Sequence, residues 1–193
     1  MKSNDFIFYD LARDVNYHDL AYINGQKLNN DNFILRFYTS NYYSYLNNYL
    51  QDKKVDYFKE EQIKSFACCL QLALSRNKGI KENTIVYRGI RKFKFPQEII
   101  KGSKFYLTEF MSTTTNIKVA KSFMGDIGTL MEIKIQNNGT NNYLNYCYDV
   151  QKISCYPNEE EILLSSHCCF VVEQITRGEL FDYVRMRCEG FIN

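Results

Sequence analysis

The stretch Asn158-Glu159-Glu160-Glu161-Ile162-Leu163-Leu164 places three carboxylates directly before a run of apolar residues. The apolar run indicates a buried strand, and side chains of an extended chain alternate between two faces. Glu159 and Glu161 are therefore expected on one face, with Glu160 on the other and least important of the three. Two converging carboxylates repel each other unless a positive ligand lies between them. The stretch is thus either a site or a charged strand start that resists edge-to-edge pairing.

The residues around this stretch show the same strand character over the second half of the chain. From Thr84 onward, short runs rich in β-branched and aromatic residues alternate with turn residues, which is typical of strands. The predicted strands are Thr84–Arg88, Phe105–Thr113, Thr129–Ile135, Glu160–Leu164, Cys169–Ile175 and Tyr183–Cys188. One short helix, Ile117–Met124, is expected among them.

The first half has a different period. Apolar residues recur every three or four positions over Asn32–Leu50 and Lys59–Arg76, which predicts two helical segments. A break is expected at Thr39–Ser40, with Ser40 capping a new helix. Helices followed by strands predict an α+β fold. We expect one domain over residues 1–193, with a helical lobe at 1–80 and a β-rich core at 81–193.

Composition narrows the functional classes. The net charge of +2 is too small to favour a nucleic-acid partner. Seven cysteines, an odd number that includes two adjacent pairs, do not form the pattern of a disulfide framework. With no Cys-x-x-Cys pair and two histidines, no metal is expected. No apolar stretch has the length of a signal peptide or a membrane span, so no membrane partner is expected. We expect a cytoplasmic protein, or an effector exported without a conventional signal peptide.

Two further segments of the strand half carry chemistry. Val86-Tyr87-Arg88-Gly89 ends a strand with an arginine, whose forked guanidinium can bind a diphosphate through two bonds. Phe110-Met111-Ser112-Thr113-Thr114 ends a strand with three hydroxyls, and a serine hydroxyl can orient a neighbouring carboxylate. Taken singly, Arg88 could be a surface arginine and the hydroxyls could cap the following helix. Together with a glutamate that stabilises positive charge at an anomeric carbon, they suit cleavage of an N-glycosidic bond beside a pyrophosphate.

These three segments, in this order, resemble the arginine–serine–glutamate class of ADP-ribosyltransferases, which includes clostridial binary-toxin enzymes and arginine-specific mono-ADP-ribosyltransferases. The matches are Tyr87-Arg88-Gly89, the pair Gly102-Ser103-Lys104-Phe105 and Phe110–Thr114, and Glu159–Leu164. Thr114 departs from the family pattern, which usually has serine there. The resemblance implies a two-sheet β-sandwich core and NAD as co-substrate. It also implies mono-ADP-ribosyl transfer to an arginine of a protein target, since a glutamate at position 159 goes with arginine acceptors.

The resemblance also implies a role for each residue. Arg88 would bind the NAD phosphates, and the backbone of Gly89 would bond the nicotinamide amide. Ser112 would orient Glu161, the catalytic glutamate that bonds the ribose 2′-hydroxyl. Glu159 would act on the acceptor guanidinium. Two more residues, Thr113 and Phe123, complete the expected NAD-binding set; Phe123 would stack on the nicotinamide ring.

Alternatives remain open at this point. Phe123 could instead be a core residue that pins its helix. The protein could be an NAD glycohydrolase that uses water as the acceptor, or a catalytically silent module that binds NAD or a protein. A monomer is expected. The target protein, and the choice between toxin, effector and endogenous regulator, are not readable from the chain.

Overall fold

Helices occupy the first part of the chain and strands the second, as the α+β prediction requires. The computed structural model describes residues 20–51, 57–77, 79–81, 83–136 and 146–191. The helices are α3 (Asn30–Phe37), α4 (Tyr43–Leu50), α5 (Tyr57–Arg76) and α6 (Ile117–Met124). A kinked segment, Tyr38–Tyr42, joins α3 to α4. The fold class is therefore confirmed, and α6 has the predicted bounds.

The predicted break between the first helices is present, but its capping residue is not Ser40. Ser40 has a non-helical ψ of −173°, which turns the chain between α3 and α4. Its hydroxyl donates back to the carbonyl of Phe37 at 2.6 Å instead of capping α4. At the start of α3, Asn29 caps the helix by accepting from the amide of Asn32 at 2.8 Å.

Eight strands form one mixed sheet in the order β4-β9-β10-β6-β3-β5-β8-β7. Only β10 and β6 run parallel among these pairs; the other described neighbours are antiparallel. The strands are β3 (Ile85–Arg91), β4 (Lys104–Leu107), β5 (Met111–Thr114), β6 (Gly128–Ile135), β7 (Cys147–Asp149), β8 (Glu161–Leu164), β9 (Cys168–Arg177) and β10 (Phe181–Phe191). A separate hairpin pairs β1 (Tyr22–Ile23) with β2 (Gln26–Lys27).

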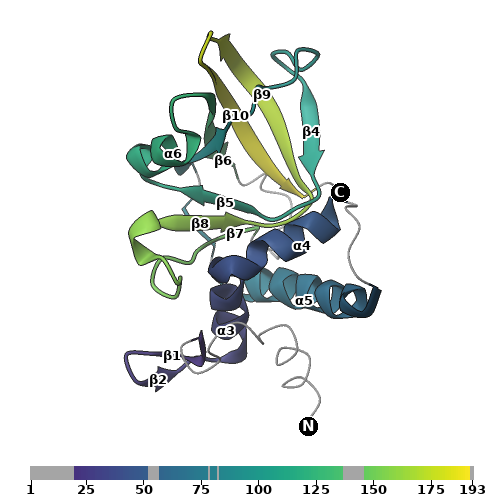
Figure 1. Cartoon of the computed structure of the whole chain (residues 1–193), viewed down its shortest axis with the longest axis vertical. Helices are drawn as coiled ribbons and strands as arrows, with labels where there is room; N and C mark the ends of the chain where they lie inside the picture. The colour runs from purple at the N-terminus through teal and green to yellow at the C-terminus, as the bar shows by residue number, and fades with distance from the viewer. Residues whose placement is uncertain (1–19, 52–56, 78, 82, 137–145, 192–193) are drawn as a thin grey trace.

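The sheet divides at its middle into two halves. The junction of β3 with β5 is a single residue pair, Tyr87 and Thr114. From this point β5, β8 and β7 run across the direction of β4, β9 and β10 (Figure 1). The two sheets expected from the resemblance are thus present and joined by one pair.

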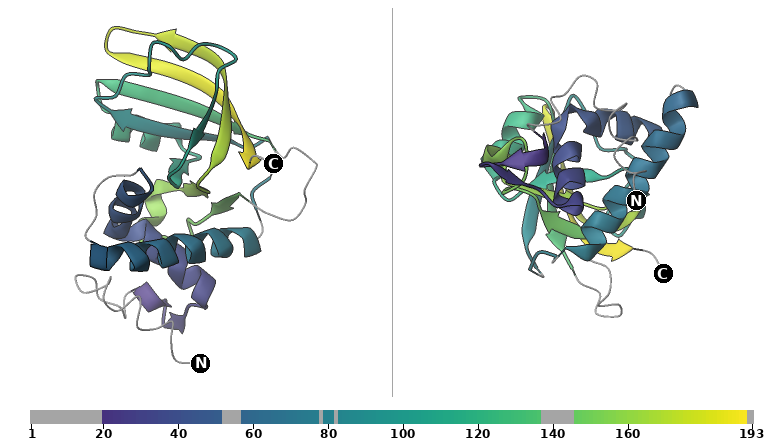
Figure 2. Two further views of the ribbon diagram at one scale, coloured as in Figure 1. Left: turned by 90° about the vertical axis from the view of Figure 1, so that its right-hand side faces the viewer. Right: turned by 90° about the horizontal axis from the view of Figure 1, so that it is seen from below.

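Three clusters of buried apolar residues pack the helices and the two sheet halves against one another. One lies between the sheet halves and includes Met111 and Ile162 on one side and Val86 and Val184 on the other. A second packs α3, α4 and α5 against the outer face of β5 and β8, through Phe110 and Leu163. Figure 2 shows this order of helices, small sheet half and large sheet half. The third cluster packs α6 onto β3 and β6.

One predicted strand was wrong. Phe105–Thr113 is two strands, because the chain bends at residues 108–109 and β4 is thereby separated from β5. β4 pairs with β9 in the large half, whereas β5 pairs with β8 in the small half. The run changes sheets while staying rich in apolar and β-branched residues, so its composition carries no sign of the break. The short strands β1, β2 and β7 were not predicted.

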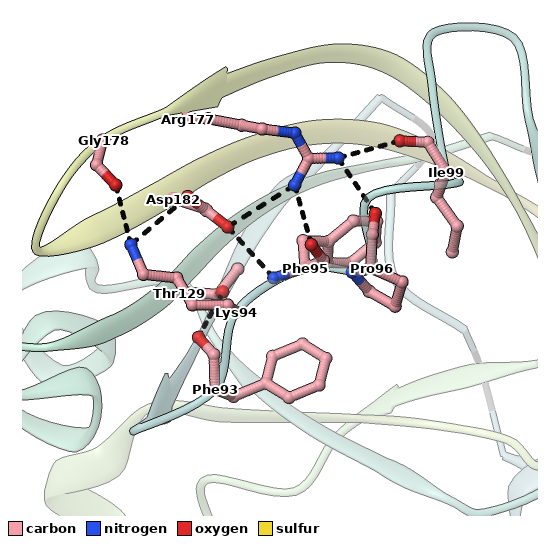
Figure 3. Close-up of polar contacts among 9 residues, drawn as sticks. All are labelled: Phe93, Lys94, Phe95, Pro96, Ile99, Thr129, Arg177, Gly178 and Asp182. Carbon is pink, nitrogen blue, oxygen red and sulfur yellow. Dashed lines mark hydrogen bonds and ion pairs between the residues drawn. The ribbon is translucent and has the colours of Figure 1, made fainter.

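A polar cluster fixes the segment between β3 and β4 to the ends of β9 and β10 (Figure 3). Asp182 is 2% exposed, accepts from the amide of Phe95 at 3.0 Å and faces Lys94 at 3.5 Å and Arg177 at 3.8 Å. Arg177 also donates to three carbonyls, those of Phe95, Pro96 and Ile99. The buried carboxylate is therefore compensated by two cations and a backbone donor.

Candidate active site

A cavity of about 340 Å³ opens beside the junction of the two sheet halves. It is bounded by the α3–α4 connection, β3, β5, α6 and the turn before β8. Its lining residues are Tyr38, Thr39, Tyr43, Tyr87, Arg88, Gly89, Ser112, Thr113, Thr114, Val119, Ala120, Phe123, Tyr156, Glu159 and Glu161. Every site residue predicted from the sequence is among them.

Strand register explains how Ser112 and Glu161 come to the same face. Residues directly opposite in an antiparallel pair share a face, and so do alternate residues of one strand. Ser112 lies opposite Leu163, and Leu163 is two residues from Glu161. Both polar side chains therefore point to the side of the sheet that Leu163 presents to the helical lobe.

Glu161 is a buried carboxylate held by two serines. Glu161 is 4% exposed, and its carboxylate is hydrogen-bonded by the side chains of Ser112 and Ser154. Burial raises the pKa of Glu161 to about 7. The two serine bonds and the Arg88 charge oppose that increase, and the Glu159 charge adds to it. The carboxylate therefore titrates near neutrality, as is common for groups at functional sites.

The period-two interpretation of the three glutamates was wrong in its geometry. Pro157–Glu159 form a 3₁₀ turn, Glu160 is left-handed at φ 48° and ψ 48°, and the strand begins at Glu161. The chain is not extended here, yet Glu159 and Glu161 both reach the cavity. Glu160 is not a free side chain on the opposite face, because its carboxylate accepts hydrogen bonds from Thr115 and Asn116; that it matters least of the three glutamates stays a prediction.

Glu159 differs from its neighbour Glu161 in what holds it. No described side chain donates a hydrogen bond to its carboxylate, and only its backbone amide is tied, to the carbonyl of Tyr156 at 3.0 Å. Partial burial raises the pKa of Glu159 above its usual range. A carboxylate with a raised pKa and no donor of its own is suited to accept a proton.

Arg88 contributes a largely uncompensated charge to the cavity. One of its terminal nitrogens donates to the carbonyl of Ser112 at 2.7 Å. Among the described residues no carboxylate lies within ion-pair distance of its guanidinium. The remaining donors can therefore bind an anionic ligand such as a pyrophosphate.

Gly89 is required by packing, a reason that the sequence did not suggest. A β-carbon built at Gly89 would lie 1.8 Å from the carbonyl oxygen of Ala120 and 2.7 Å from the amide nitrogen of Met124. Both atoms belong to the backbone of α6, so no side-chain movement could relieve the clash. The glycine lets α6 lie directly on β3.

The hydroxyls of the two threonines in the Ser112–Thr114 motif make different contacts. Thr113 is 4% exposed and donates to the carbonyl of Ile162 at 2.7 Å, so its hydroxyl joins β5 to β8. The hydroxyl of Thr114 accepts from the amide of Asn116 at 3.0 Å and shapes the turn into α6. A serine could make the same bond, so the departure from the family pattern leaves this contact intact.

Phe123 is not a core residue. Its side chain is 50% exposed and lines the cavity, whereas Ala120 and Met124 form the buried face of α6. The structural alternative considered for Phe123 is therefore wrong. An exposed aromatic ring at a cavity wall is available to stack on a planar ligand.

Several site residues were missed from the sequence. Tyr38, Tyr43 and Tyr156 supply aromatic walls, and the last two are about half exposed at 51% and 48%. Ser154, 4% exposed, bonds Glu161, and Arg36 fixes its backbone by donating to the carbonyls of Ile153 and Ser154 at 2.8 and 2.9 Å. The Arg36 contacts join segments more than a hundred residues apart, for which local patterns carry no signal.

Comparison with solved structures identifies the fold. ADP-ribosyltransferase Vis from Vibrio splendidus, solved in complex with agmatine, is 20% identical with a TM-score of 0.69; the match covers 97% of this chain and 86% of Vis. Exoenzyme S from Pseudomonas aeruginosa, in complex with human 14-3-3 protein beta and bound to carba-NAD, is 20% identical with a TM-score of 0.66, covering 96% of this chain and 82% of that one. The eukaryotic mono-ADP-ribosyltransferase ART2.2 is 20% identical with a TM-score of 0.65, covering 100% and 81%. The fold is therefore that of the ADP-ribosyltransferases.

The chain belongs to the ADP-ribosyltransferase exoenzyme family, whose sequence model matches residues 16–186. That match spans both the helical lobe and the strands. No curated protein sequence matches the chain in a direct search. No helix among the described residues is long and apolar enough to cross a membrane.

Proposed function

We propose that this protein is a mono-ADP-ribosyltransferase that moves ADP-ribose from NAD to an arginine side chain of a target protein and releases nicotinamide. The observation that carries the proposal is the presence, in one cavity that also contains Arg88, of a buried, serine-held Glu161 and of a Glu159 carboxylate to which no described side chain donates. Exoenzyme S was solved bound to carba-NAD, and Vis with agmatine, a small guanidinium compound. Both ligands are consistent with the proposed donor and acceptor.

The residues of the cavity fit NAD by charge and shape. Arg88 has free guanidinium donors for the pyrophosphate, which a bidentate arginine binds well. Phe123 presents an exposed ring that can stack on nicotinamide, and the backbone of Gly89 lies at the same wall. The hydroxyl of Thr113 already donates to β8, so Thr113 would contribute to NAD binding only by forming part of the cavity wall.

Glu161 supplies the charge that bond cleavage needs. As the bond between the ribose C1′ and the nicotinamide nitrogen breaks, its electron pair leaves with nicotinamide and positive charge develops on the ribose. A buried carboxylate near that position stabilises the charge more strongly than one in water. Ser112 and Ser154 keep the carboxylate oriented and favour its ionised form.

Glu159 completes the transfer on the acceptor side. The guanidinium of arginine keeps its proton at neutral pH, because its pKa lies far above neutrality. A nitrogen of the guanidinium forms the new bond to C1′ as its proton passes to the Glu159 carboxylate, and the proton then leaves to solvent. Selection of arginine follows because the carboxylate both attracts the cation and accepts the proton.

The test is an assay with labelled NAD and three acceptors: agmatine, water alone and a cell lysate. We expect labelled agmatine and labelled arginine residues in a lysate protein, with nicotinamide released in at least the amount of ADP-ribose transferred. NAD consumption without labelled agmatine or protein would indicate the glycohydrolase alternative. No NAD consumption under any condition would favour the silent binding module.

A further inference from the structure

Glu160 has an unusual backbone for its residue type. It is left-handed, a conformation uncommon for residues other than glycine, asparagine and aspartate. Such residues persist where surrounding contacts hold them, and they concentrate at functional sites. The contacts of Glu160 identify what holds it.

The carboxylate of Glu160 is bonded through both oxygens to the segment that begins α6. Oε1 accepts from Nδ2 of Asn116 at 2.8 Å, and Oε2 accepts from Oγ1 of Thr115 at 3.1 Å. The amide of Thr115 also donates to the carbonyl of Glu160 at 3.3 Å. Asn116 is the N-cap of α6, since its Oδ1 accepts from the amide of Lys118 at 3.0 Å.

These bonds join the two sides of the cavity. On one side is the turn that carries Glu159 and Glu161, and on the other is α6, which carries Phe123. We propose that Glu160 is a positioning residue: its carboxylate fastens the turn to the N-cap of α6 and thereby sets the place of Glu159 relative to the ligand. The proposal rests on the proposed function for its catalytic consequence.

The two neighbours should depend on this fastening unequally. Glu161 is also held by the β8 pairing and by two serines. Glu159 has a backbone bond to Tyr156 and no described side-chain donor, so its position depends on the turn itself. Loosening the turn should therefore reduce transfer to agmatine more than hydrolysis of NAD.

The first variant is Glu160→Asn. Asparagine tolerates the left-handed backbone, and its shorter side chain cannot span both donors. We expect transfer to fall about tenfold and hydrolysis to fall less, since small displacements of a catalytic group reduce rates strongly. Glu98→Asn, at an exposed glutamate outside the cavity, is the matched control and should leave both rates unchanged.

A donor–acceptor exchange tests the bond to Asn116 itself. Asn116→Asp keeps a capping oxygen for α6 but sets a second carboxylate against Glu160. Adding Glu160→Gln lets the new amide donate to that carboxylate while its oxygen accepts from Thr115. We expect Asn116→Asp to lower the transfer-to-hydrolysis ratio about tenfold, and the double variant to restore most of it.

A second readout does not depend on activity. Amide hydrogen exchange at Thr115 reports the backbone bond to Glu160, and exchange should accelerate in Glu160→Asn and in Asn116→Asp but not in the double variant. An unchanged ratio and unchanged exchange in both single variants, or a double variant no better than Asn116→Asp, would overturn the proposal. If the unaltered protein consumes no NAD, the proposed function fails while the exchange experiment still decides the fastening.

Discussion

Glu159 and Glu161 lie two residues apart and line the same cavity, but their surroundings differ. Glu161 begins β8, the strand between β5 and β7, is 4% exposed and bonds two serines. Glu159 ends a 3₁₀ turn, is partly exposed and has no described side-chain donor. The difference supports the division of work proposed above, in which Glu161 is a fixed, desolvated charge for the donor and Glu159 an adjustable carboxylate for the acceptor.

The largest effect should come from Glu161→Gln. The amide has the shape of the carboxylate but no charge, so we expect both NAD hydrolysis and transfer to fall by at least about 10²-fold. Nicotinamide release and labelled agmatine, measured in parallel, check this. A variant that loses transfer alone would contradict the division between the two glutamates.

Glu159→Gln should have a large but selective effect. Without its proton acceptor, transfer to agmatine should fall by about 10²-fold or more, whereas hydrolysis should stay within severalfold of the unaltered protein. The same two assays give the ratio. Equal losses of transfer and hydrolysis would mean that Glu159 also takes part in cleaving NAD, which would contradict the division of roles between Glu159 and Glu161.

The serine bonds should have a moderate effect that depends on pH. Activity requires ionised Glu161, so kcat/KM for NAD hydrolysis should rise with pH through the pKa of about 7. Ser112 and Ser154 lower this pKa, so Ser112→Ala and Ser154→Ala should move the rise to higher pH. At pH 7 we expect losses of up to about tenfold, with partial recovery at pH 9.

A matched control separates this effect from general disturbance. Ser75 is on α5, and its hydroxyl donates to the carbonyl of Leu72 outside the cavity. Ser75→Ala should leave the pH profile in place. A profile that also stays in place in Ser154→Ala would show that its bond to Glu161 does not tune the carboxylate.

The smallest effect concerns stability. The pKa of Glu161 is raised from 4.5 to about 7 in the folded protein, so between these values the folded state binds more protons than the unfolded state. The free energy of unfolding should therefore fall as pH rises through this window, by at most about 1.4 kcal/mol per pH unit from this group. Glu161→Gln should lack this contribution.

Denaturant unfolding from pH 4.5 to 8 measures the difference between the two proteins. The variant should gain stability relative to the unaltered protein as pH rises, and the gain should level off above pH 7. A constant difference across the range would mean that the carboxylate is not desolvated in solution.

The sequence allowed the main parts of the fold and the site to be predicted. The helical period located α4 and α5, and the α6 bounds matched fully. The residues Arg88, Ser112, Glu159 and Glu161 were identified from their segments and meet in one cavity. The local patterns alone were ambiguous, and the resemblance of the three segments to one family identified these residues. One local expectation was wrong: the strand does not end at Arg88, because β3 continues to Arg91.

What was missed depends on contacts between distant segments. The break between β4 and β5 follows from their different pairing partners, which lie about fifty residues or more away. The left-handed Glu160 is held by Thr115 and Asn116, 45 and 44 residues earlier. The acidic run Glu159–Glu161 carries no local sign of this left-handed residue, so the extended interpretation of the three glutamates was wrong in its geometry.

Gly89 bears on how such motifs are used to judge activity. Its missing β-carbon makes room for the backbone of α6, whether or not a nucleotide is present. A pseudoenzyme with this fold would need the same glycine after it had lost its glutamates. Gly89 therefore diagnoses the architecture, and only the charged residues Arg88, Glu159 and Glu161 bear on catalysis.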